Sequence, residues 1–269
     1  MKRLLAGGLA GAVSTGVRAV AKAKPLPSWD RKSYSGSTVS LTGGLQAGAG
    51  ALVGACIGAQ NGGTRAGSIA NVSGAVAGYI DDHLEDSFPA RGKGFRGHLG
   101  ALKNGQVTSG LLKIGVIGLG SLVSAAVLAQ QRGTHRCVNT VVDSLLIAST
   151  ANLVNLLDLR PGRALKVTAA GALPVALSSS AQAHSAAGIV GSSLAALPAD
   201  LRGETMLGDL GANAVGAQLG VVLAGSLPLP ARLVALTTTI GLTAASEKIS
   251  FSQVIDENPV LSWIDNLGR

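Results

Sequence analysis

Apolar stretches rich in glycine and alanine recur along the whole chain, and short polar gaps separate them. Nine such stretches lie at about 4–21, 43–60, 65–80, 107–129, 137–156, 164–180, 184–198, 211–227 and 231–246. Several are shorter than the roughly 20 residues that a spanning helix needs, but their regular recurrence predicts an all-α fold. We expect one polytopic membrane helix bundle over residues 1–269, with about nine transmembrane helices and a range of eight to ten.

The low share of charged residues excludes an ordinary soluble domain. Only 13% of the residues are charged, against about 25% in a typical soluble domain, and the mean hydropathy is +0.40. The net charge of +8 does not indicate a nucleic-acid partner, because the basic residues lie in short gaps and aromatic residues for base stacking are few. A basic surface that faces anionic lipid headgroups or phosphates fits this pattern better.

Glycines spaced four residues apart occur in several of the stretches. Gly50, Gly54 and Gly58 form one such series, and Gly216 and Gly220 form another. In lipid, small residues at this spacing let two helix backbones approach closely. The glycines do not belong to a phosphate-binding loop of the GxxxxGK[ST] type, which the sequence lacks. We therefore expect them to pack helices against one another.

Nearly all acidic residues fall in alternate gaps between the stretches. The gaps at 22–42, 81–106, 157–163 and 199–210 and the tail from 247 contain every one of the 14 Asp and Glu residues except Asp143. Most Lys and Arg residues share these gaps, so the positive-inside rule places this side in the cytoplasm. We expect a multi-pass protein of the cell (inner) membrane whose functional residues face the cytoplasm.

The first two of these gaps carry residues suited to phosphate and cation chemistry. Lys32 precedes the Gly43–Gly44 pair; it would hold phosphate, and the glycines would offer backbone N–H groups to an anion. The alternative is an ordinary lysine at the membrane surface.

Asp81 and Asp82 are adjacent at a helix end, where two carboxylates repel each other unless a cation neutralises them. The pair indicates Mg²⁺ ligation or a base acting on a phosphate, with a hydrated polar cap as the alternative.

Two further motifs lie in the later gaps. Asn152, Asn155 and Asp158 are three residues apart, so they share nearly one face of a helix. Amides inside a membrane helix need partners, and these would either bind a substrate or link two helices. Asp209 lies among glycines at the start of a helix, where it would be either a metal ligand or an N-terminal cap.

In this order and on this one side, the four motifs resemble those of the polytopic polyprenyl-phosphate N-acetylhexosamine-1-phosphate transferases (glycosyltransferase family 4). This superfamily includes the phospho-N-acetylmuramoyl-pentapeptide transferase of peptidoglycan synthesis and the undecaprenyl-phosphate N-acetylglucosamine-1-phosphate transferase. The resemblance extends from about Trp29 to Asn213. It rests on Lys32 before Gly43–Gly44, Asp81–Asp82 after Gly78-Tyr79-Ile80, the series Asn152, Asn155 and Asp158, and Gly208-Asp209-Leu210-Gly211.

The resemblance implies an enzyme that transfers a sugar-1-phosphate from a nucleotide diphospho-sugar, typically UDP-linked, to a polyprenyl phosphate for cell-envelope glycan synthesis. It implies that Asp209 binds Mg²⁺ and that Asp81 and Asp82 are the catalytic residues beside the lipid phosphate. A homodimer follows from family analogy alone. The implied substrate-binding residues are Lys32, Asn152, Asn155 and Asp158.

The chain departs from the family pattern at two places, both of which concern donor recognition. The Asn/Asp motif usually continues with Gly-x-Asp-Gly, whereas here Pro161 replaces the second Asp, between Arg160 and Arg163. A His-rich cytoplasmic loop near the C-terminus is also typical of the family, and no His follows His184. Arg160 and Arg163 would supply bidentate contacts to a diphosphate instead.

Two other functions stay open on the sequence alone. The departures fit a catalytically silent relative that binds polyprenyl phosphate or scaffolds envelope-synthesis proteins. A transporter is the other alternative, because Arg18, Lys113 and Asp143 lie in or near apolar stretches and would line an ion path. The same three residues would otherwise pair with one another inside the bundle.

Overall fold

Helices make up almost all of the regular structure in the computed structural model, which describes residues 2–33, 36–57, 62–88, 100, 108–132 and 136–269. The long helices of this part of the chain are α1 (Lys2–Ala23), α2 (Thr42–Ile57), α3 (Gly62–Leu84), α5 (Ser109–Gln130), α6 (Arg136–Leu157), α7 (Arg163–Leu177), α8 (Ala183–Leu201), α9 (Gly208–Ser226) and α10 (Leu229–Ser246). Two short helices, α11 (Phe251–Glu257) and α12 (Pro259–Asn266), follow them. The prediction of an all-α fold is confirmed.

The long helices coincide one by one with the nine apolar stretches of the sequence. Local chemistry explains several of the boundaries. The side chain of Thr108, for example, accepts a hydrogen bond from the N–H of Leu111 at the start of α5, as expected for an N-cap. Between α1 and α2 the chain forms a small antiparallel hairpin of strands β1 (Asp30–Lys32) and β2 (Thr38–Ser40).

Three of the described helices, α1, α5 and α6, are long and apolar enough to cross a membrane. The expected number of about nine spans is therefore not supported by length and hydropathy alone. Helix α2 is apolar but has only 16 residues. The remaining long helices are either shorter than a spanning helix or too rich in small and polar residues to reach the same hydropathy.

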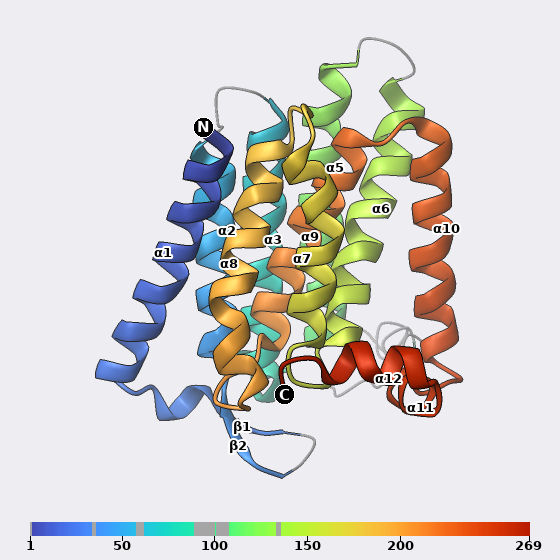
Figure 1. Ribbon diagram of the computed structural model, residues 1–269. Coiled ribbons are helices and arrows are strands. Elements are labelled where there is room, and N and C mark those ends of the chain that lie inside the picture. Colours follow the sequence, from blue (N-terminus) through green and yellow to red (C-terminus); the bar gives the residue numbers. More distant parts are fainter. Residues whose placement is uncertain (1, 34–35, 58–61, 89–99, 101–107, 133–135) are drawn as a thin grey trace.

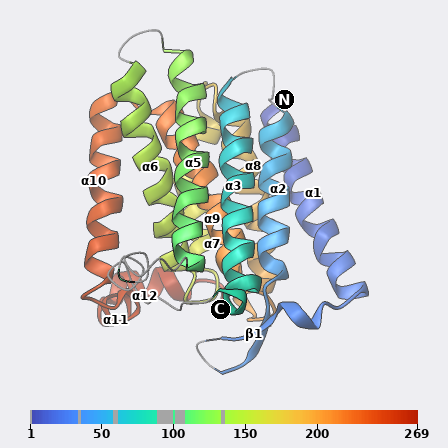
Figure 2. The ribbon, with the colours of Figure 1, turned by 180° about the vertical axis from the view of Figure 1, so that it is seen from behind.

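Helix α9 lies at the centre of the bundle (Figures 1 and 2). Fifteen of its 19 residues are buried, and α2, α3, α6 and α7 pack around it. Helix α1 packs on α2 and α8, and α10 packs on α6, so these two helices lie at opposite edges (Figure 1). Burial on all sides explains why α9 carries no charged residue after Asp209 in its first turn.

The connections that contain the acidic residues gather at one end of the bundle, which we call the site end. It carries the β1–β2 hairpin, the end of α3, the turn at 158–162, the loop at 202–207, and helices α11 and α12 (Figure 1). A bridge between Ser40 and Thr205 and a hydrogen bond from the N–H of Leu210 to Asp82 join these connections directly. The prediction that the alternate gaps share one side is confirmed for their described parts; residues 89–99 and 101–106 of the gap at 81–106 lie outside the described residues.

The three charged residues considered for an ion path do not pair with one another. Each is held by other residues: Arg18 by Glu204 at 2.8 Å, Lys113 by Asp81 and Asp209, and Asp143 by Arg132 and Arg232 at 2.6 Å each. Asp143 is fully buried. A buried carboxylate needs such partners because an uncompensated charge in a low-dielectric interior is strongly destabilising.

Close contacts between helices depend on glycine. A Cβ atom on Gly54 of α2 would lie 2.2 Å from the Cα atom of Gly188 on α8. One on Gly220 of α9 would lie 2.6 Å from the Cα atom of Ile147 on α6. The expected packing role is confirmed for these glycines, whereas Gly58 lies outside the described residues.

The variant Gly54→Ala is expected to destabilise the protein by about 1–3 kcal/mol, because the added methyl group forces the α2 and α8 backbones apart. Gly118→Ala on α5 is the matched control, since nothing lies within 4 Å of its Cβ position and Ala is the better helix former. Thermal unfolding of the detergent-purified protein, followed by circular dichroism, measures both. Equal Tm values for the two variants would contradict the packing role of Gly54.

Candidate functional site

Carboxylates from two other segments hold the first turn of α9. Asp158, directly after α6, accepts a hydrogen bond from the N–H of Gly208 at 2.8 Å. Asp82, in the last turn of α3, accepts hydrogen bonds from the N–H groups of Asp209 and Leu210 at 3.2 and 2.9 Å. N–H groups in a first helical turn have no partner within the helix, and the positive end of the helix dipole favours carboxylates. Helices α3, α6 and α9 are therefore joined at one point of the site end.

The backbone conformation of Gly208 makes this junction possible. Its φ of +60° lies in the left-handed region, which residues with a side chain rarely adopt. A Cβ atom there would also lie 2.9 Å from the Leu41 side chain and 3.1 Å from Asp82 Oδ2. The glycine that precedes Asp209 is therefore required by the turn that leads into α9 and by the closeness of Asp82.

A lysine links two of the predicted site residues. The ammonium group of Lys113, near the start of α5, lies 3.3 Å from Asp81 Oδ2 and contacts Asp209 Oδ2. The Asp81 carboxyl group also contacts Asp209 and the Ser109 side chain. The Lys113 charge thus compensates two carboxylates that would otherwise repel each other. From the sequence, Lys113 was expected either to line an ion path or to pair with Arg18 and Asp143 inside the bundle. Its position in an apolar helix indicated that it needs an acidic partner.

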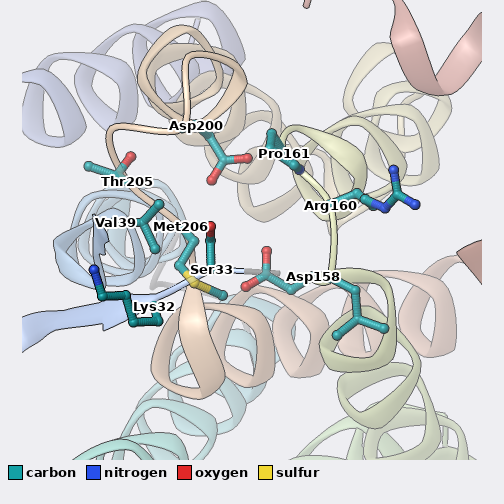
Figure 3. Close-up of a pocket in the computed structure, with 11 residues that line it drawn as sticks. Lys32, Ser33, Val39, Asp158, Arg160, Pro161, Asp200, Thr205 and Met206 are labelled. Atoms are coloured by element: carbon teal, nitrogen blue, oxygen red, sulfur yellow. The ribbon is translucent and has the colours of Figure 1, made fainter. Parts of the chain in front are cut away.

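A cavity of about 350 Å³ opens beside this junction (Figure 3). Its lining comes from the hairpin, the turn after α6 and the segment from the end of α8 to α9: Lys32, Ser33, Val39, Asp158, Leu159, Arg160, Pro161, Asp200, Gly203, Thr205 and Met206. Figure 3 shows the carboxyl groups of Asp158 and Asp200 directed into the space between them, whereas the Arg160 guanidinium group extends away from it. The sequence did not single out Asp200, although it shares a gap with Asp209.

Two acids buried beside this cavity dominate its electrostatics. Burial raises the pKa of the Asp158 carboxyl group well above its usual range, and the negative charge of Asp200 raises it further. The hydrogen bond from the N–H of Gly208 acts in the opposite direction but does not offset these effects. Asp200 in turn accepts a hydrogen bond from the N–H of Gly162. The cavity therefore favours a ligand that brings a cation or hydrogen-bond donors.

The β1–β2 hairpin brings Lys32 to the edge of the cavity. The ammonium group of Lys32, at the end of β1, donates a hydrogen bond to Thr38 Oγ1 at 2.9 Å. The Arg31 guanidinium group donates one to the backbone oxygen of Asp82 at 2.5 Å, and β2 forms a bridge to Thr205. The hairpin is thus fastened both to α3 and to the loop before α9.

An aromatic cluster adds to this attachment. The ring of His83, next to Asp82 on α3, stacks on Tyr79 with ring centroids 4.6 Å apart. The Trp29 ring meets His83 at a centroid distance of 4.4 Å and a tilt of 56°. The contact fixes the chain before β1 against the end of α3.

Two predicted substrate-binding residues lie outside the cavity. Asn152 is exposed and donates a hydrogen bond to Thr243 of α10 at 3.3 Å, where it lines a second cavity of about 470 Å³ between α6 and α10. Asn155 is half-buried and does not line the cavity that contains Asp158. Asp158 directly follows α6 and is buried against Gly208, whereas Asn152 lies exposed toward α10, so the three predicted residues do not meet in one site.

The two arginines expected at a diphosphate are engaged by the C-terminal helices. The Arg163 guanidinium group is 4% exposed and forms a bidentate pair with Asp265 of α12, at 2.8 and 3.0 Å. Arg160 lines the cavity but pairs with Asp256 of α11 at 3.1 Å. The sequence did not reveal these pairs, since the two acids follow 96 and 102 residues later.

The Gly43–Gly44 pair also differs from expectation. A Cβ atom on Gly43 would lie 2.5 Å from the backbone oxygen of Met206, and one on Gly44 would lie 2.3 Å from that of Leu207. These glycines therefore let α2 pack against the chain that enters α9. They do not offer an open surface to an anion.

Comparison with protein families and curated proteins gives no match. No model of a known protein family matches the chain, and no curated protein matches it. Within the described ranges, no group of three His, Cys, Asp or Glu side chains is already arranged to hold a metal ion.

The variant Lys113→Met is expected to lower the free energy of unfolding by about 1–3 kcal/mol, because it leaves Asp81 and Asp209 without their cation. The effect stays below that of a fully buried pair, since the two carboxylates are 25% and 26% exposed. Denaturant unfolding of Lys113→Met, Asp209→Asn and the double variant forms a double-mutant cycle. The exposed Lys24→Met is the control; a coupling energy of zero between Lys113 and Asp209 would contradict the assigned contact.

Proposed function

We propose that the chain is a membrane-embedded transferase that moves a sugar-1-phosphate from a nucleotide diphospho-sugar to a polyprenyl phosphate for cell-envelope glycan synthesis. The supporting observation is that acids from three separate motifs meet at the start of α9: Asp81, Asp82, Asp158 and Asp209. A purely structural junction would not need so many like charges, because holding them together costs stability. Clusters of carboxylates are typical of sites that bind hard cations. The UDP form of the donor follows from the family resemblance.

In this proposal the nine long helices form one integral-membrane domain of the cell (inner) membrane, and the site end faces the cytoplasm. The helices α1, α5 and α6 support a membrane location through their length and hydropathy. Helices α2, α3 and α7 pack around α9 and would be partly shielded from lipid in this way, whereas α10 lies at the edge of the bundle on α6. The concentration of Lys and Arg in the gaps of the site end supports the cytoplasmic orientation.

The donor set of Asp81 and Asp209 fits Mg²⁺, the ion that the resemblance implies. Carboxylate oxygens are the hard ligands that Mg²⁺ prefers, and both side chains are about a quarter exposed, which leaves them reachable from water. Lys113 already binds both carboxylates, so the pair attracts positive charge. When bound, Mg²⁺ would supply charge neutralisation for the donor diphosphate.

Asp82 has a different role from Asp81 in the proposed site. Both oxygens of Asp82 accept hydrogen bonds from the first turn of α9. A carboxylate used in this way positions the neighbouring Asp209 and is poorly placed to take a proton from a substrate. We therefore assign Asp81 to the reacting lipid phosphate and treat Asp82 as a positioning residue.

The proposed reaction is a phosphoryl transfer. A phosphate oxygen of the acceptor lipid attacks the β-phosphorus of the donor, and the bond from that phosphorus to the bridging oxygen breaks. The products are a lipid diphospho-sugar and a nucleoside monophosphate. This chemistry depends on positioning and charge neutralisation more than on covalent catalysis. Lys113 beside the carboxylates and Lys32 at the cavity supply cations from the chain itself.

A transfer assay with radiolabelled UDP-sugars and polyprenyl phosphate in detergent tests the proposal. Asp81→Asn and Asp209→Asn are each expected to lower kcat by about 10²–10³-fold, since each removes charge from the reacting centre. Asp30→Asn is the control, because Asp30 is an exposed acid at the same end of the bundle. Omitting Mg²⁺ is expected to abolish turnover. Turnover like that of the unmodified protein in both Asp81 and Asp209 variants would refute the assignment.

One alternative has structural support. In a catalytically silent relative, Lys113 would permanently take the place of the cation between Asp81 and Asp209, and Arg163 would serve only to hold α12. Such a protein would bind polyprenyl phosphate or scaffold envelope-synthesis proteins without releasing a nucleotide. Lipid binding in the absence of any Mg²⁺-dependent nucleotide release distinguishes it from the enzyme.

A further inference from the structure

The C-terminal segment, residues 249–269, forms a helical pair across the site end. Helices α11 and α12 lie crosswise to the long helices (Figure 1). The side chain of Asn258 accepts hydrogen bonds from the N–H groups of Val260 and Leu261, and Pro259 occupies the first turn of α12. Both are typical signals for a helix start, so the sequence itself specifies a break between the two helices.

The side of α12 that faces the bundle is polar. Asp265 is 7% exposed and forms its bidentate pair with Arg163, the first residue of α7. The Lys166 ammonium group donates a hydrogen bond to the backbone oxygen of Asp265 at 2.7 Å. Bidentate arginine–carboxylate pairs are among the strongest and most directional side-chain contacts. Helix α12 is thus attached to the bundle through charge and hydrogen bonds.

Further contacts tie the segment to the turn after α6. Arg269 donates a hydrogen bond to the backbone oxygen of Pro161 at 2.7 Å, and Asp256 of α11 pairs with Arg160 at 3.1 Å. This turn supplies Asp158, Arg160 and Pro161 to the cavity. The segment therefore holds one wall of the cavity in place.

The segment exposes an apolar face. Its exposed large apolar residues are Ile249 (51%), Val254 (42%), Val260 (65%), Leu261 (42%), Trp263 (65%), Ile264 (45%) and Leu267 (45%), and polar residues such as Gln253, Glu257 and Asn266 are exposed beside them. A surface helix in water normally shows the reverse arrangement, with the apolar stripe against the core and polar residues outside. An exposed apolar face of this size needs a partner.

The position of the segment favours lipid as that partner. The turn that it holds follows α6, one of the three helices long and apolar enough to cross a membrane. The segment therefore lies at the level where α6 would leave the bilayer, and tryptophan is enriched at this level. Residues 249–269 contain three acids and one basic residue, so attraction to anionic headgroups does not drive the contact. Insertion of apolar side chains does.

We infer that the C-terminal segment is an interfacial clamp. Its outward residues, Trp263 and Ile264 among them, insert into the boundary between lipid headgroups and acyl chains. Asp265 holds Arg163 at the start of α7, and Arg269 holds the backbone of Pro161 in the turn at 158–162. The inference concerns the membrane contact of this segment and holds whether or not the chain is a transferase.

Fluorescence of the full chain in zwitterionic nanodiscs tests this inference. The chain has two tryptophans, Trp29 and Trp263, so Trp29→Phe leaves Trp263 as the only reporter. We expect blue-shifted emission, protection from aqueous acrylamide, and about twofold stronger quenching by lipids brominated near the headgroup than by lipids brominated near the bilayer centre.

Two further variants in the Trp29→Phe background separate insertion from mere proximity. Ile264→Asp, on the apolar face, is expected to reduce the lipid quenching of Trp263 by about half, because burying a charge at the interface is unfavourable. Asn266→Asp adds the same charge at an exposed polar position of α12 and is expected to leave quenching unchanged.

Three results would overturn the clamp. Strong acrylamide quenching without quenching by brominated lipids would place Trp263 in water. Protection from both quenchers would mean that a second copy or another part of the chain covers the face. If the protein did not enter nanodiscs and stayed folded in aqueous buffer, it would not be a membrane protein, and the proposed lipid contact would be refuted.

Discussion

The buried start of α9 is the constraint on which the rest of the structure depends. A helix at the centre of a bundle cannot leave the N–H groups of its first turn unpartnered, because each buried group without a partner costs about 1–3 kcal/mol. Asp82 and Asp158 provide the partners from α3 and from the turn after α6. The same contacts fix three helices relative to one another and bring Asp209 next to Asp81. The architecture and the candidate site thus have a common origin.

Charges at the site end are compensated over short distances. Lys113 forms ion pairs with Asp81 and Asp209, and Arg163 forms one with Asp265. Asp158 is the exception: its partner is a backbone N–H, its neighbour Asp200 is another acid, and its pKa is raised. A ligand that brings hydrogen-bond donors therefore also gains on the cavity side of the junction. On the other side, a cation at Asp81 and Asp209 would share these carboxylates with Lys113.

Small side chains and polar helix ends have separate tasks in this bundle. Glycines such as Gly54 and Gly220 allow backbones to approach within a distance that any side chain would prevent. Because these contacts involve small residues, few large apolar side chains interlock between the helices to determine how they are arranged. The polar contacts at the site end, from Asp82 and Asp158 to Asp265, supply that specificity through directional hydrogen bonds.

The sequence alone determined the helices, their order and the shared side of the acidic gaps, because hydropathy and glycine spacing act locally along the chain. It also singled out Asp81, Asp82, Asp158 and Asp209, since charged residues at the ends of apolar segments are conspicuous. Only the tertiary structure decided what each of them faces. The spacing of residues along one helix predicts the direction in which each side chain points. The residue that a side chain contacts lies on another helix, and the packing of the two helices sets the distance and angle between them. For that reason Lys113 was missed as the bridge, Asp82 proved to cap α9, and Arg163 proved to hold α12.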